Sequence, residues 1–136
     1  MQNICLIIGA GAGVGGNVAK VFANDGYHVY LTRRSDEIGL KKLIDTINAS
    51  GGKASGKLMN AIKDNTIEDL IHEIEKDLGP ISVVIYNLGA QIGNKKLEDL
   101  TLKQFDLGLK MGTVGIFRLS KTLFPYMVKR GRGTLI

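Results

Sequence analysis

Apolar residues along the chain gather in two kinds of run, and the first of each kind follow one another directly. Residues 3–8 (Asn-Ile-Cys-Leu-Ile-Ile) form an apolar run of strand length, which is typical of a strand covered on both faces. A bend rich in glycine follows, and from Val14 the apolar positions recur at helical spacing. This helix should end near Asp25, because glycine, here Gly26, is common just past a helix. The pattern predicts a strand, a glycine turn and a helix in immediate succession.

The rest of the chain repeats this alternation. Further strands are expected at residues 27–32, 53–59, 81–86 and 133–136, and the run 81–86 is apolar enough to be central. Strands that alternate with helices predict an α/β fold with a doubly wound parallel sheet of the Rossmann type. We expect one domain over residues 1–136, incomplete at the C-terminus because the fifth strand has barely begun.

Polar residues at the expected helix starts set the helix boundaries. Ser35 and Thr66 are expected to cap the second and third helices. Thr101 and Gln104 have the spacing of a capping box and predict a long helix as far as about residue 129. Pro125 should kink that helix, since proline lacks the amide that the helix interior needs.

The glycine turn, residues 9–16, contains two overlapping glycine patterns. Gly11, Gly13 and Gly16 satisfy G-x-G-x-x-G, whereas Gly9, Gly13 and Gly15 satisfy G-x-x-x-G-x-G. The second pattern is preferred, because the strand ends at residue 8 and the bend should begin at once. A helix N-terminus behind such a turn offers free N–H groups to a phosphate. The alternative is a flexible turn without a ligand.

The second strand ends in a pair of arginines, Arg33 and Arg34, followed by Ser35. A dinucleotide site for NAD carries an acid about twenty residues past the first glycine, whereas arginine suits the 2′-phosphate of NADP. The sequence therefore favours NADP over NAD, and two exposed surface arginines are the alternative. We expect the glycine turn, Arg33, Asn60 and Asn87 to meet at one edge of the sheet, since each follows a strand.

Composition and charge narrow the function classes. The net charge is +5, but basic residues are scattered among acids, and their one cluster, residues 129–132, has no interleaved aromatic residue, so nucleic-acid binding is not expected. No apolar run is long enough to cross a bilayer, and no basic leader precedes the first strand, which favours a cytoplasmic protein. Cys5 is the only cysteine, and His28 is expected to be an exposed surface residue without a metal partner.

Several motifs, taken in order, resemble the short-chain dehydrogenase/reductase family over all 136 residues. The turn Gly9-x-x-x-Gly13-x-Gly15 is similar to the glycine motif of that family. Residues 86–90 (Tyr-Asn-Leu-Gly-Ala) resemble its N-N-A-G segment, with tyrosine in place of the first asparagine. Residues 124–127 (Phe-Pro-Tyr-Met) and 131–134 (Gly-Arg-Gly-Thr) resemble the passage from its long helix into the fifth strand.

The resemblance implies a set of cofactor-binding residues. Asn60 occupies the position of the adenine-contacting aspartate of the family, and Asn87 would lie beside the cofactor or serve only as a turn residue. Gly112 replaces an asparagine that supports the proton relay in the family. The complete expected set is Gly9, Gly11, Ala12, Gly13, Val14, Gly15, Arg33, Arg34, Ser35, Asn60, Ala61, Asn87 and Gly89.

The resemblance also implies an activity, namely reversible hydride transfer between NADP(H) and a carbonyl or alcohol substrate. The catalytic serine and the Tyr-x-x-x-Lys pair of the family fall beyond Ile136, so this chain alone is expected to be inactive. Tyr126 and Arg130 have a similar spacing, but arginine does not exchange protons, and Tyr126 is interpreted as structural. The alternative is a non-catalytic short form that binds a nucleotide or a partner.

The family commonly pairs its long helix with the same helix of another subunit, so the full-length protein is expected to be a homo-oligomer. The isolated chain is expected to be marginally stable and to self-associate, because an incomplete sheet leaves an open edge.

Overall fold

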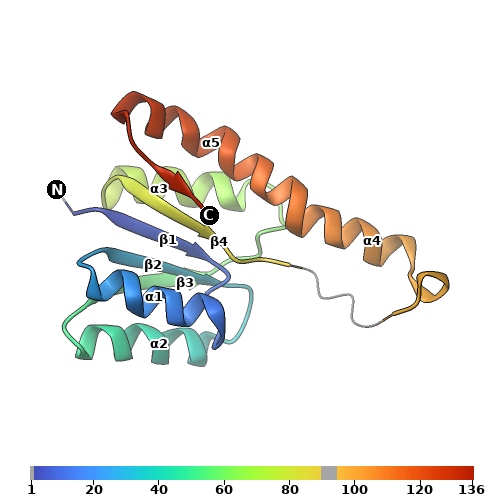
Figure 1. Cartoon of the computed structure of the whole chain (residues 1–136), viewed down its shortest axis with the longest axis horizontal. Helices are drawn as coiled ribbons and strands as arrows, with labels where there is room; N and C mark the ends of the chain where they lie inside the picture. The colour runs from blue at the N-terminus through green and yellow to red at the C-terminus, as the bar shows by residue number, and fades with distance from the viewer. Residues whose placement is uncertain (1, 90–94) are drawn as a thin grey trace.

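The computed structural model describes residues 2–89 and 95–136 and shows one parallel sheet with helices on both faces (Figure 1). The α/β Rossmann-type fold predicted from the alternation of runs is confirmed. In chain order the elements are β1 (Ile4–Ile8), α1 (Val14–Asn24), β2 (His28–Arg33), α2 (Glu37–Ala49), β3 (Lys53–Leu58), α3 (Thr66–Asp77), β4 (Ile81–Tyr86), the 3₁₀ helix η1 (Leu97–Asp99), α4 (Leu102–Leu109), the π-helix η2 (Lys110–Val114), α5 (Gly115–Arg130) and β5 (Thr134–Leu135).

The strand order is β3-β2-β1-β4-β5, with every neighbouring pair parallel. The chain first winds outward from β1 through β2 to β3, and then returns to the other side of β1 for β4. The switch in winding direction therefore lies between β1 and β4. Ligands of open parallel sheets bind at the carboxyl ends of the strands beside such a switch.

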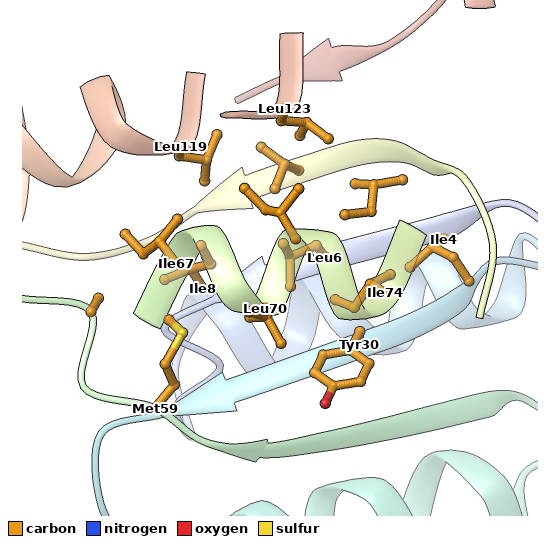
Figure 2. Close-up of a cluster of buried hydrophobic side chains, with 14 of the residues drawn as sticks. Ile4, Leu6, Ile8, Tyr30, Met59, Ile67, Leu70, Ile74, Leu119 and Leu123 are labelled. Atoms are coloured by element: carbon orange, nitrogen blue, oxygen red, sulfur yellow. The ribbon is translucent and has the colours of Figure 1, made fainter. Parts of the chain in front are cut away.

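Two hydrophobic cores enclose β1, which explains its continuous apolar run. Ile4, Leu6 and Ile8 face the core beneath α3 and α5, together with side chains such as Ile67 and Leu119 (Figure 2). Cys5 and Ile7 face the opposite core, formed with α1 and α2. Alternate residues of a strand point to opposite faces, so a strand between two helical layers is apolar at every position.

Two predicted helix caps are wrong by one residue. Asp36, in the left-handed region at φ 63°, caps α2 in place of Ser35, and its carboxylate accepts a hydrogen bond from the amide of Gly39 at 3.0 Å. Asn65 occupies the cap position of α3, and Thr66 is the first helical residue. The hydroxyl of Thr66 instead donates to the carbonyl of Asn60 at 2.9 Å, which holds the turn before the helix.

The capping box at Thr101 is confirmed: its hydroxyl accepts from the amide of Gln104, whose side chain accepts from the amide of Thr101. The long helix behind it is not uniform. The π-helical segment η2 separates α4 from α5, and α5 then runs through Pro125 to Arg130. The kink expected at Pro125 stays a prediction, and the sequence did not predict η2.

His28 is half-buried, which corrects its expected position on the exposed surface. It begins β2, an interior strand, and its Nε2 atom lies 2.8 Å from the hydroxyl of Ser55 on β3. Burial, with a further contribution from Lys53, lowers the pKa of His28. A charged imidazole is disfavoured there because it would lose water and face another cation.

No helix in the described part of the chain is both long and apolar enough to cross a bilayer. Ala90, the last residue of the predicted Tyr-Asn-Leu-Gly-Ala motif, lies outside the described residues.

Candidate functional site

Residues from the carboxyl ends of four strands line one cavity. Arg33 and Arg34 come from the end of β2, Asn60 follows β3, and Leu88 follows β4. The predicted meeting of the glycine turn, Arg33 and Asn60 at one edge of the sheet is confirmed through Gly9. Asn87 is not a lining residue and joins this edge through its hydrogen bond to Gly9. The full lining is Ile8, Gly9, Thr32, Arg33, Arg34, Met59, Asn60, Ala61, Ile62, Leu88 and Met111.

The glycine turn packs closely against the end of β4. Gly9 has a φ of 93°, in the left-handed region, and a Cβ there would lie 3.0 Å from the carbonyl carbon of Asn87. The side chain of Asn87 donates from Nδ2 to the carbonyl of Gly9 at 3.0 Å. A Cβ at Gly15 would lie 2.9 Å from the Cα atom of Ala10. Side chains at Gly9 and Gly15 would therefore push the turn away from the sheet.

The N-terminus of α1 opens into the space above this turn. Gly13 is the N-cap and supplies no side-chain acceptor, so the amides of the first turn are not satisfied by a cap. Ala12, Gly13 and Val14 are exposed, and a Cβ at Gly11 or Gly13 would meet nothing within 4 Å. A row of accessible amides at the positive end of a helix is a donor set that fits a diphosphate.

The two arginines at the end of β2 have different surroundings. The side chain of Arg33 is 11% exposed, donates from Nε to the carbonyl of Ala10, and pairs through Nη1 with the carboxylate of Asp36 at 2.7 Å. Arg34 is exposed and lines the same cavity. Arg33 therefore braces the glycine turn, while the guanidinium of Arg34 is accessible to a ligand.

The turn between β3 and α3 contributes a further part of the cavity lining. The Asn60 side chain accepts from the amide of Ile62 at 3.3 Å, and Ala61 is buried. Arg118 of α5 donates to the carbonyl of Ala61 at 2.9 Å and pairs with Glu68 at 2.7 Å. The hydrogen bonds from Arg118 hold the pKa of Glu68 below its usual value. The sequence did not predict these contacts of Arg118, because their partners lie at least fifty residues away in the chain.

The remaining predicted site residues are not part of the lining of this cavity. Gly11 and Ala12 line a second depression, which shares Arg33 with the first. Ser35 and Gly89 are exposed and are not among the residues that line either hollow. The apolar lining residues Met59, Ile62, Leu88 and Met111 were not predicted, although the first three follow strand ends.

Tyr126 and Arg130 do not pair with each other, and each has its partner on α3. The Tyr126 hydroxyl lies 2.9 Å from Nδ1 of His72, and Arg130 pairs with Glu75 at 2.7 Å. Both side chains therefore join α5 to α3. Burial raises the pKa of Cys5 to about 12, so its thiol stays protonated in the core. Among the described residues, no group of three metal-ligating side chains comes together.

The family model for short chain dehydrogenases matches residues 3–136. The chain belongs to the short-chain dehydrogenase family. Among curated members, gluconate 5-dehydrogenase of Gluconobacter oxydans is 30% identical over 131 residues, covering 96% of this chain and 50% of that protein.

Solved structures of family members share the fold. A gluconate 5-dehydrogenase from Burkholderia cenocepacia, in complex with NADP and tartrate, has a TM-score of 0.85 at 21% identity, covering 99% of this chain and 52% of that one. An actinorhodin polyketide ketoreductase variant with NADPH has a TM-score of 0.89 at 24% identity, covering 98% of this chain and 51% of that one. This short-chain dehydrogenase chain thus spans about half the length of the relatives that it matches.

Proposed function

We propose that this chain is the cofactor-binding part of an NADP-dependent oxidoreductase of the short-chain type. Its reaction would be reversible hydride transfer between NADP(H) and a small carbonyl or alcohol substrate, and the bound cofactor supplies that hydride chemistry. The observation that carries the proposal is the convergence of the glycine turn, two arginines and Asn60 on one cavity. Family membership and the NADP and NADPH named for two structural neighbours support it.

The proposed roles follow the geometry of the site. The amides of the exposed residues 12–14 would bind the diphosphate at the start of α1, as helix N-termini do. Asn60 and Ala61 would contact the adenine, because an asparagine oxygen can accept from the adenine amino group. Asn87 and Gly89 would border the cofactor as it passes the end of β4, and Ser35 would lie beside the adenosine phosphate. Residues 1–136 would act as one NAD(P)-binding domain.

NADP is proposed over NAD because of the arginine pair. Arg34 is accessible at the cavity, and a guanidinium binds a phosphate through paired, charge-assisted hydrogen bonds. Arg33 would contribute positive charge, while its ion pair with Asp36 limits how far it can turn towards a ligand.

Calorimetric titration with NADP(H) and NAD(H) tests this proposal. The parent should prefer NADP(H), and Arg34→Ala should weaken NADP(H) binding by about 1.5–3 kcal/mol, the usual value of a hydrogen bond to a charged group. Arg132→Ala is the matched control, because it removes the same charge from an exposed residue beside β5. Equal affinities of the parent for NADP(H) and NAD(H) would contradict the preference.

A second candidate, a short form that binds a nucleotide or partner without catalysis, is favoured by two observations. Tyr126 and Arg130 contact His72 and Glu75 of α3. Gly112 has no side chain with which to support a proton relay. Sequencing the DNA that follows the codon of Ile136 separates the candidates. A continued reading frame that encodes Ser and Tyr-x-x-x-Lys would favour the enzyme, and a stop codon would favour the short form.

We also propose that the whole protein is a homo-oligomer. Large apolar side chains are exposed along α4 and α5, including Leu102 at 75%, Phe117 at 62% and Val128 at 78%. Apolar surface of this kind is typical of interfaces between subunits. A cytoplasmic location stays a prediction from the sequence.

A further inference from the structure

The interruption of the long helix at η2 frees one backbone carbonyl. The amide of Gly115 donates to the carbonyl of Lys110, five residues earlier. In a regular α-helix the same amide would donate to the carbonyl of Met111, four residues earlier. The change in spacing therefore takes the ordinary helical donor away from Met111.

A tyrosine from the sheet supplies a donor to that carbonyl. The hydroxyl of Tyr86, the last residue of β4, donates to the carbonyl oxygen of Met111. Burial raises the pKa of Tyr86, so the hydroxyl keeps the proton that it donates. A half-buried hydrogen bond thus joins the carboxyl end of β4 to η2.

Gly115 makes the space in which the tyrosine ring lies. A Cβ at this buried glycine would overlap the Tyr86 hydroxyl and lie 3.0 Å from the ring carbon Cζ. Tyr86 and Gly115 therefore form a complementary pair, in which a larger residue at either position would displace the other.

The same contact sets one wall of the candidate site. Met111 lines the cavity together with Arg34, Asn60 and Leu88. Tyr86 directly precedes Asn87, whose side chain donates to the carbonyl of Gly9, another residue of the lining. The position of Met111 thus depends on a residue that does not itself line the cavity.

We propose that Tyr86 is a positioning residue, whose hydroxyl holds the π-helical turn so that Met111 closes the cavity around the adenosine part of the cofactor. The role in binding rests on the proposed function, whereas the pairing of Tyr86 with Gly115 does not. In the proposed enzyme, Tyr86 would act only through Met111.

The first experiment measures the affinity of the chain for 2′,5′-ADP, the adenosine half of NADP. Tyr86→Phe keeps the ring and removes the hydroxyl, and it should weaken binding about threefold to tenfold, as expected for one hydrogen bond. The preference for NADP over NAD should not change, because Arg34 is untouched. Tyr126→Phe is the matched control, since it removes a tyrosine hydroxyl bonded to His72 on α3, a helix that contributes no residue to the cavity lining.

A merely structural role for Tyr86 would lower thermal stability and leave the affinity of the folded protein unchanged. An unchanged affinity for 2′,5′-ADP in folded Tyr86→Phe would therefore overturn the positioning role. A folded parent that binds no 2′,5′-ADP would overturn the proposed function and the positioning role together.

The second experiment tests the pairing without any ligand. Gly115→Ala should lower the midpoint of thermal unfolding strongly in the parent and less in the Tyr86→Phe background, where the overlapping hydroxyl is gone. Such non-additivity is expected of residues in direct contact. Equal losses in the two backgrounds would show that Gly115 does not make room for the tyrosine hydroxyl, and would overturn the pairing on its own.

Discussion

Individual polar side chains in this molecule make contacts that the residues beside them in the sequence do not predict. His28 lies between β1 and β3, where Ser55 is its hydrogen-bond partner and Lys53 is a nearby cation. Asp36 caps α2 and also holds the guanidinium of Arg33 against the glycine turn. For His28, burial and the nearby charge of Lys53 together lower the pKa.

The lowered pKa of His28 predicts a pH dependence of stability. Below the ordinary histidine pKa of about 6.5 the unfolded chain takes up a proton that the folded chain resists. The contribution of His28 to the free energy of unfolding should therefore keep its full value above about pH 6.5. It should be lost as the pH falls through the lowered pKa of the folded state. Replacing His28 with Asn should remove this part of the dependence, as measured by thermal unfolding between pH 7.5 and about 5.

The other histidine provides the control. His72→Asn leaves His28 in place, so the component assigned to His28 should persist. If both variants follow the parent profile, the dependence arises from other groups.

Helices α3 and α5 are joined by polar pairs along the edge of their apolar contact. Glu68, His72 and Glu75 lie at intervals of three or four residues on one face of α3, and their partners are Arg118, Tyr126 and Arg130 of α5. Glu75 is the most enclosed: its side chain is 7% exposed and also accepts from the amide of Ile81 at 2.9 Å. The Glu75–Arg130 pair thus links α3 and α5 to the start of β4.

Breaking this pair on one side should be costly. Arg130→Met leaves the Glu75 carboxylate buried without its cation, and the free energy of unfolding should fall by about 3–5 kcal/mol. Arg132→Met, at an exposed neighbouring position, should change it by less than about 0.5 kcal/mol. Urea denaturation of the two variants measures the difference, and similar losses would contradict the assigned role of Glu75.

Among the described residues, α4 and α5 carry nearly half of the exposed large apolar side chains. In Figure 1 α5 lies beside α3 and the sheet, whereas α4 projects beyond the sheet. Phe105, Phe117, Phe124 and Val128 are between 44% and 78% exposed. Phe117, Phe124 and Val128 are spaced seven and four residues apart, so they share one face of α5.

We expect the chain to self-associate through this face. Phe117→Glu should shift the molecule towards monomer in sedimentation equilibrium, because a charge cannot be buried there without a partner. Ile38→Glu is the control, since Ile38 is 85% exposed as a single apolar residue on α2. A parent that remains monomeric over the whole concentration range would contradict the oligomer.

The sequence alone determined the order of the strands, the helices between them and the edge of the sheet where the candidate site lies. The spacing of apolar residues, the positions of glycines and the spacing of Thr101 and Gln104 are all local properties of the sequence. The strand at residues 3–8, the glycine turn and the capping box could therefore be predicted. Only the tertiary structure decided the π-helical turn at Lys110–Val114 and the hydrogen bond from Arg33 to the carbonyl of Ala10. Both depend on how side chains meet in three dimensions. Tyr86 and Met111 are 25 residues apart, and nothing in the residues beside either one indicates that contact.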